Sequence, residues 1–185
     1  WDGAYVGTSE TYRSSLDAAR RADVRWHRTR PGDSLVVDGV RLSVLAPDSA
    51  WMAGLDAPNE ASVVVLVRYG AVRVLLMGDA ERGEERWLLA HRDSLEADVL
   101  KVGHHGSSTS STAPFLDAVS PRLALVSVGA GNSYGHPSAA VMSSLAAHRA
   151  IVLRTDREGT IVVRTDGSRI EVEEEGDRWT LSGAR

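Results

Sequence analysis

Cysteine is absent from these 185 residues, which excludes a disulfide framework, a thiolate metal site and a cysteine nucleophile. Long apolar runs are missing too, because no stretch approaches the ~18 consecutive apolar residues of a membrane span. Basic residues are not in surplus: 21 Lys and Arg stand against 25 Asp and Glu, for a formal net charge of −4. This balance argues against a strongly basic nucleic-acid platform. It still allows a nuclease whose acidic, metal-filled pocket contacts phosphates.

The start of the chain shows neither a charged-then-apolar signal pattern nor an initiating methionine, since it begins at Trp1. We expect a fragment or a processed product for that reason. Hydrophobic residues make up 43% of the chain and charged residues 25%, which is typical of a soluble globular protein. The length is enough for one core, so residues 1–185 are expected to form a single domain.

The hydrophobic pattern predicts one helix, then hairpins, then alternating strands and helices. The helix is expected at about 11–21, and the turn dipeptides Asp38-Gly39 and Tyr69-Gly70 each join two apolar runs into a hairpin. Strand–helix alternation follows from residue 80, and short strands separated by Asp/Gly turns end the chain. This order predicts an α/β sandwich in which helices cover a mixed sheet. Four tryptophans are expected in the core or on a hairpin face: Trp26, Trp51, Trp87 and Trp179.

Three loops follow apolar strands and present side chains that can bind metal or transfer protons. They contain Asp79 in "LLMGDAE", His104 and His105 in "KVGHHGS", and His136 in "YGHPS". Ligand sites of α/β sheets gather at strand ends, so these loops can share one pocket. Their glycines permit the tight backbone that such an approach requires.

Each residue also has a simpler interpretation. Asp79 stands where a turn residue or a helix N-cap is common. His136, which precedes proline, is in its simpler interpretation a loop residue that bonds to backbone. Of these residues, the His104-His105 pair is the strongest indication of a functional site, because adjacent imidazoles between glycines pack poorly in a core. The hydroxyl tract "SSTSST" after it is either a flexible loop, a cap for the next helix or a phosphate-binding segment.

The motifs "LLMGDAE", "GHHGS", "SVG" and "YGHP", at these separations, resemble the metallo-β-lactamase-like domain at the C-terminal end of ComEC-type competence proteins. The resemblance runs from about Trp26 to the strand at "GTIVVRTDG". It implies an αββα sandwich and a centre of two divalent metal ions, zinc or manganese, that activates water for phosphodiester hydrolysis. Asp79 matches the aspartate that bridges the metals. His104, His105 or His136 matches a later histidine ligand, and spacing does not choose among them.

The superfamily's main metal-binding signature, His-x-His-x-Asp-His, does not occur in the sequence. The resemblance places it just before Trp1, so we expect an N-terminally truncated domain without about half of its metal ligands. Asn59 occupies a region where many members carry another histidine. A domain that lacks strands has an exposed sheet edge, through which a homodimer is expected.

The resemblance implies a nuclease domain of a bacterial DNA-uptake channel that degrades the strand that is not imported. Lys101, Ser107 and Ser108 are then expected to position backbone phosphates, and Asn59 to bind weakly or orient water. The implied partners are DNA and the membrane channel portion of the same polypeptide, with the domain on the extracytoplasmic face of the inner membrane. This chain alone is expected to bind metal weakly and to be inactive. Two alternatives remain open: a metallohydrolase of another ester, and a non-catalytic module that binds DNA or braces the channel.

Overall fold

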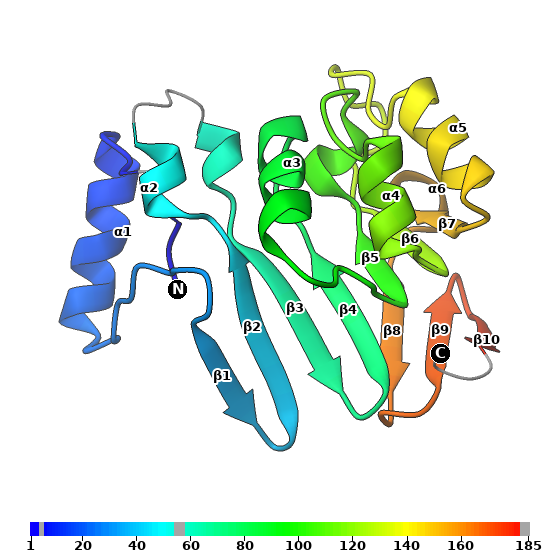
Figure 1. The fold of residues 1–185 in the computed structure, drawn as a ribbon, viewed down its shortest axis with the longest axis horizontal. Coiled ribbons are helices and arrows are strands. Elements are labelled where there is room, and N and C mark those ends of the chain that lie inside the picture. The colour runs from blue at the N-terminus through cyan, green and yellow to red at the C-terminus, as the bar shows by residue number, and fades with distance from the viewer. Residues whose placement is uncertain (4–5, 54–57, 182–185) are drawn as a thin grey trace.

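The protein is described by a computed structural model that covers residues 1–3, 6–53 and 58–181. Within these ranges, two sheets and several helices are stacked in layers (Figure 1). The larger sheet contains β1 (Ser34–Val37), β2 (Val40–Ala46), β3 (Val64–Tyr69), β4 (Val72–Leu76), β5 (Val99–Lys101), β6 (Leu123–Val126) and β7 (Ile151–Arg154). The smaller sheet contains β8 (Ile161–Thr165), β9 (Ile170–Glu174) and β10 (Asp177–Leu181).

The helices connect and cover these strands. They are α1 (Glu10–Arg21), α2 (Ser49–Met52), α3 (Arg82–His91), α4 (Ala113–Val119), α5 (Ala139–Ala147) and α6 (Thr155–Glu158), with 3-10 turns η1 (Pro58–Ala61) and η2 (Gly103–Gly106). The predicted helix at 11–21 is α1, and the longer helices after residue 80 are α3, α4 and α5. The short α2 and α6 and the two 3-10 turns are additions to the predicted elements.

The seven strands of the larger sheet lie side by side in chain order. β1 to β4 are antiparallel, and the first hairpin turns at Asp38 and Gly39, both with positive φ, as that dipeptide predicts. β4 to β7 are parallel, joined by connections that carry α3, α4 and α5. The carboxyl ends of β4, β5 and β6 therefore open at one edge, where the three predicted loops begin.

Alternation of side chains along the central strands builds two separate cores. On β5, Leu100 points into the core beneath the helices, whereas Val99 points into the core shared with the smaller sheet. Val72 and Leu123 join Val99 there and pack against that sheet. The layers are thus helices, large sheet and small sheet, which confirms the metallo-β-lactamase-like α/β sandwich. Among the described residues, no helix is long and apolar enough to span a membrane.

The tryptophan prediction holds in part. Trp87 is buried in the helix-side core, and the half-buried Trp51 lies beside it with ring centroids 6.3 Å apart. Trp179 packs against the smaller core. The prediction for Trp26 is wrong: its side chain is 48% exposed, because it follows α1 in a loop that no apolar layer covers.

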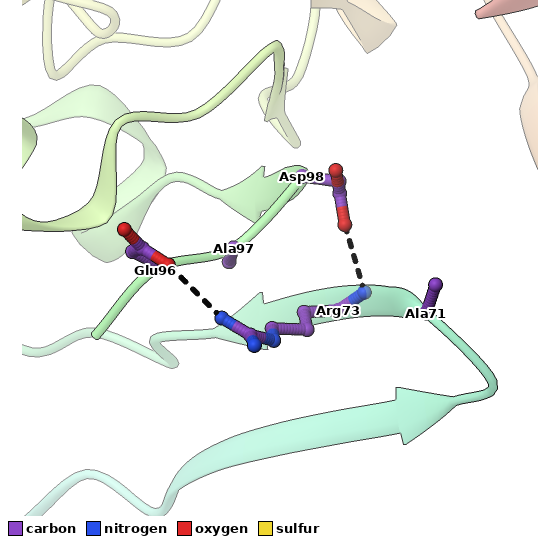
Figure 2. A pocket seen from close by; sticks show the side chains of 5 residues that line it. All are labelled: Ala71, Arg73, Glu96, Ala97 and Asp98. Carbon is purple, nitrogen blue, oxygen red and sulfur yellow. Dashed lines mark hydrogen bonds and ion pairs between the residues drawn. The ribbon is translucent and has the colours of Figure 1, made fainter. Parts of the chain in front are cut away.

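A small pocket near the amino end of β5, at the far end of this strand from the histidine loop, is built around Asp98 (Figure 2). The Asp98 carboxylate accepts a hydrogen bond from the Arg73 backbone N–H at 3.0 Å and lies 3.7 Å from the Arg122 guanidinium. Its own backbone N–H donates to the Arg73 carbonyl at 2.9 Å. Asp98 thus connects β4, β5 and β6, and its role is structural.

Asp98→Ala is expected to lower the free energy of unfolding by about 2–3 kcal/mol, because it removes the acceptor of the part-buried Arg73 N–H and one ion-pair partner of Arg122. The matched control is Glu96→Ala, which removes the exposed ion pair of Glu96 with the Arg73 side chain at 3.1 Å (Figure 2). That loss is expected to be under about 0.5 kcal/mol. Urea denaturation of both variants measures the difference, and equal losses would contradict the assigned role.

β1 forms an edge of the larger sheet and leaves apolar side chains in solvent. Leu35, Val36 and Val37 are each about half exposed. Such an edge can pair with another strand, so the homodimer stays a prediction. We expect the weight-average mass in sedimentation to rise with concentration, and Val36→Lys to abolish that rise. A monomer at every concentration, in both proteins, would contradict the prediction.

Candidate functional site

The three predicted loops leave the sheet edge together and are connected by backbone hydrogen bonds. The His104 N–H donates to the Gly78 carbonyl at 3.1 Å, which joins the histidine loop to the Asp79 loop. The Ser138 N–H donates to the Gly106 carbonyl at 2.9 Å, which joins it to the His136 loop. A Cβ on Gly106 would lie 2.6 Å from the Pro137 Cβ, so this approach requires glycine.

His105 faces Asp79. The two histidines both adopt left-handed backbone, with φ of 44° at His104 and 54° at His105, which turns their rings in different directions. His105 Nδ1 lies 2.7 Å from the Ser127 carbonyl oxygen and must donate to it, because a carbonyl only accepts. His105 Nε2 lies 3.3 Å from Asp79 Oδ1.

The His105–Asp79 pair therefore needs a positive charge. With the proton of a neutral imidazole on Nδ1, Nε2 and the carboxylate oxygen are two acceptors that face each other. Either a second proton on the ring or a cation must lie between these groups. Metal-binding histidines typically donate their other N–H to a carbonyl or carboxylate in this way. Both side chains are a little under half exposed, so the pair is open to solvent.

His104 has different partners. Its Nδ1 lies 3.0 Å from Glu81 Oε1 and 3.3 Å from Thr109 Oγ1. Asn59 Nδ2 donates to the same Glu81 oxygen at 3.1 Å. Glu81 thus orients both side chains. Its carboxylate connects Asn59, which occupies the region where many superfamily members carry a histidine, to the His104 ring.

Glu81 is absent from the site residues predicted from the sequence. It stands at the N-cap of α3, where an acidic side chain usually caps the helix, but it makes no capping hydrogen bond. Glu60, from η1, accepts from the Gly83 N–H at 2.9 Å and also from the Glu84 N–H, and so caps α3 in its place. The only available signal was the Asp-x-Glu spacing after the strand.

His136 completes the cluster of imidazoles. Its ring centroid lies 5.7 Å from that of His104, and that of His105 lies 6.4 Å from His104. Desolvation, and then the neighbouring His104 and His105, lower the pKa of His136, which favours its neutral form. Asn132 holds the backbone of this loop by accepting from the His136 N–H at 3.1 Å and donating to its carbonyl at 2.8 Å.

The residues predicted to contact phosphate lie in different environments near the corner of the sheet formed by the Asp79, His104-His105 and His136 loops. Lys101 Nζ donates to the Val102 carbonyl at 2.9 Å, and burial lowers its pKa although Asp79 acts in the opposite direction. Ser107 is buried, with its hydroxyl 3.0 Å from Thr109 Oγ1, whereas Ser108 is exposed and its carbonyl accepts from Arg82. Substrate contact by these residues and by Asn59 stays a prediction.

Ser110, Ser111 and Thr112 of the hydroxyl tract brace the loop. Ser110 Oγ donates to the Gly103 carbonyl at 2.8 Å. The Ser111 and Thr112 N–H groups donate to the buried Glu85 carboxylate of α3, at 2.5 and 2.9 Å. Because these donors are occupied, they cannot also hold a phosphate, and Glu85 fixes the two residues that precede α4.

A metal ion fits part of this corner. Asp79 and His105 supply one carboxylate and one imidazole with the orientation that a cation requires. Three or more His, Asp or Glu side chains do not converge anywhere in the described ranges in a way that could hold a metal ion. Zinc takes four ligands, so the described residues account for part of a donor set and not for a two-metal centre.

The fold and this corner define a class of protein. A family model described as "Metallo-beta-lactamase superfamily" matches residues 7–130, and the chain belongs to that superfamily. The resemblance to ComEC-type competence proteins is also confirmed by curated relatives. "ComE operon protein 3" of Bacillus subtilis is 36% identical over 149 residues, which are 80% of this chain and 19% of that protein.

Two further relatives match at similar levels. "Competence protein ComA" of Neisseria gonorrhoeae is 37% identical over 160 residues, 86% of this chain and 21% of that protein. "Recombination protein 2" of Haemophilus influenzae is 33% identical over 176 residues, 95% of this chain and 20% of that protein. The chain therefore spans about a fifth of the length of each of these relatives.

Proposed function

We propose that this chain is the nuclease portion of a bacterial DNA-uptake protein, in which it hydrolyses phosphodiester bonds of the strand that is not imported. The observation that carries the proposal is the His105–Asp79 pair, which is arranged to share a cation at the open edge of a superfamily sheet. The names of two curated relatives, which contain "competence" or belong to a "ComE operon", support the biological context.

The chain's own residues divide the work. Asp79 and His105 hold the cation, and the Ser127 carbonyl accepts the imidazole proton on Nδ1 so that Nε2 can face the cation. Glu81 holds His104 through Nδ1, so that the other ring nitrogen can contact a substrate oxygen. The lowered pKa of His136 favours its neutral form, which can accept a proton or act as a ligand. Two bound divalent ions would lower the pKa of a water and stabilise the leaving oxygen.

The proposal extends to the cofactor and to the surroundings. The metal is zinc or manganese, because imidazole and carboxylate ligands suit both. The partners are DNA and the membrane channel portion of the same polypeptide, and the domain lies on the extracytoplasmic face of the inner membrane. A His-x-His-x-Asp-His segment, which these 185 residues lack, would supply the remaining ligands. The 185-residue chain alone is then a weak metal binder without nuclease activity.

The test compares cleavage of labelled DNA by the 185-residue chain and by a longer protein that also carries a His-x-His-x-Asp-His segment ahead of it, each with Mn²⁺ or Zn²⁺. We expect cleavage only by the longer protein. Manganese-dependent cleavage by the short chain, lost in Asp79→Asn, would contradict the assignment of half the ligands to another segment. Cleavage of a carboxylic ester or lactam, with DNA left intact, would favour a metallohydrolase of another substrate.

A non-catalytic module is the second candidate, because the described residues supply only part of a metal site. Such a module would bind DNA or brace the channel. It predicts that Asp79→Asn leaves DNA uptake intact and that the longer protein cleaves no DNA. Loss of degradation of the non-imported strand in that variant would exclude this candidate.

A further inference from the structure

Positive charge is concentrated in one short stretch of this acidic chain. Residues 13–30 contain six arginines and two aspartates, whereas the whole chain has a formal net charge of −4. In Figure 1 this stretch forms α1 and the loop after it, at the left end of the molecule and outside the larger sheet. Asp79 and the histidines lie in loops after β4, β5 and β6, and none of them lines the groove beside this stretch.

The arginines of this stretch are available for a ligand. Arg20, Arg21 and Arg25 are exposed, and none forms an ion pair with another described residue. Some arginines elsewhere in the described chain are paired instead: Arg154 pairs with Asp156 at 2.6 Å, and Arg164 pairs with Glu173 at 2.7 Å. Unpaired guanidinium groups clustered on one surface favour an anionic partner.

An apolar groove lies beside these arginines. It encloses about 380 Å³, within the usual range of ligand pockets. Its lining is Leu16, Ala19, Arg20, Asp23, Val24 and Trp26. Val24 and Trp26 are 58% and 48% exposed, and none of the residues of α1 is buried. The Arg28 guanidinium lies 5.4 Å from the Trp26 ring centroid and covers it from one side.

We propose that this groove and its arginines bind single-stranded DNA. A base stacks on the Trp26 ring within the groove, while Arg20, Arg21 and Arg25 contact the backbone phosphates. An aromatic ring in a basic setting suits single strands because their bases expose flat faces, which a duplex keeps stacked and an acidic peptide lacks. The choice of DNA over RNA rests on the proposed function, but binding here requires neither metal nor hydrolysis.

The test is fluorescence anisotropy of the 185-residue chain with a labelled oligothymidylate of about 20 nucleotides, in EDTA so that no metal contributes. We expect Trp26→Ala to weaken binding about tenfold and Trp26→Phe to retain most of it. Removal of three phosphate contacts by Arg20→Gln, Arg21→Gln and Arg25→Gln should reduce the slope of log affinity against log salt by about 2. Circular dichroism confirms that each variant is folded.

The matched control replaces Arg41, Arg68 and Arg86 by glutamine, because these are also exposed and remove the same charge from other elements. We expect this control to keep the affinity and the salt slope of the unaltered chain. Equal losses in both triple variants, or an unchanged affinity of Trp26→Ala, would overturn the proposal. So would equal binding of duplex DNA or poly-glutamate. If the 185-residue chain binds in EDTA but the longer protein cleaves no DNA, the nuclease proposal is wrong and the proposed DNA-binding surface is still supported.

Discussion

Asp79→Asn is expected to lower DNA cleavage by the longer protein at least about 1,000-fold, and His105→Ala to do the same. Each substitution removes one half of the pair that shares a cation, since Asp79 Oδ1 and His105 Nε2 lie 3.3 Å apart. Groups that act as a unit are strongly non-additive, so the double variant should lose no more than either single variant. Initial rates on labelled DNA at saturating Mn²⁺ measure all three.

Two further variants separate direct from indirect roles at this corner. Glu81→Gln should cost about 10–100-fold, because Glu81 orients His104 and binds no substrate itself. His148→Ala serves as the control, since this imidazole contacts Ser144 and Asp117 and not the site. If the loss of activity in the double variant equalled the product of the losses in Asp79→Asn and His105→Ala, the two residues would not share one cation. A large loss in His148→Ala would also contradict the assigned roles.

Glu84→Gln is expected to change how stability depends on pH. Glu84 is fully buried and neither carboxylate oxygen makes a hydrogen bond, so burial, and then the Glu60 charge, raise its pKa to about 10. The nearby Ser62 amide, outside hydrogen-bonding geometry, offsets only part of this rise. The group is therefore protonated in the folded protein and ionised in the unfolded chain at neutral pH.

Glu84 links stability to pH because its pKa is higher in the folded protein than in the unfolded chain. Folding takes up a proton between the unfolded pKa and the folded value, so this contribution to stability is complete below about pH 4.5 and is lost as pH rises toward about 10. Glu84→Gln removes the contribution. The unfolding free energy of the unaltered chain should therefore fall by up to about 3 kcal/mol more between pH 6 and 8 than that of the variant. Urea denaturation at several pH values measures it.

The neighbouring Glu85→Gln provides a matched contrast. Glu85 is equally buried but accepts from the Ser111 and Thr112 N–H groups and from the Thr112 hydroxyl. An amide would turn its NH₂ group toward one of these donors and cost about 2–4 kcal/mol. If Glu84→Gln were the more destabilising of the two, or left the pH slope unchanged, the neutral state assigned to Glu84 would be wrong.

Local signals predicted the scaffold of the site well. The Asp38-Gly39 turn, the strand before Asp79 and the glycines around the two histidines each depend on neighbouring residues, and the structure confirms those elements. The convergence of Asp79 and His105 also followed from the rule that parallel strands open at one edge. Which histidine faces Asp79 did not follow, because the ring directions depend on left-handed backbone at both positions.

Contacts distant in sequence were beyond the same reasoning. Glu81 resembles a helix cap until the structure shows that Glu60, more than 20 residues earlier, takes that position. The hydroxyl tract resembles a free loop until Glu85 is seen to occupy its amides. Trp26 resembles a core residue because aromatic side chains usually are buried, yet the segment that carries it packs under no layer of the described structure.

In the proposed function Asp79 and His105 hold a divalent cation, and metal content measures this without reference to any substrate. Elemental analysis of the longer protein, dialysed against Zn²⁺ or Mn²⁺ and then against metal-free buffer, should find about two ions per chain. Asp79→Asn should retain clearly fewer. Equal metal in both proteins, or none in either, would contradict the account and favour the non-catalytic module.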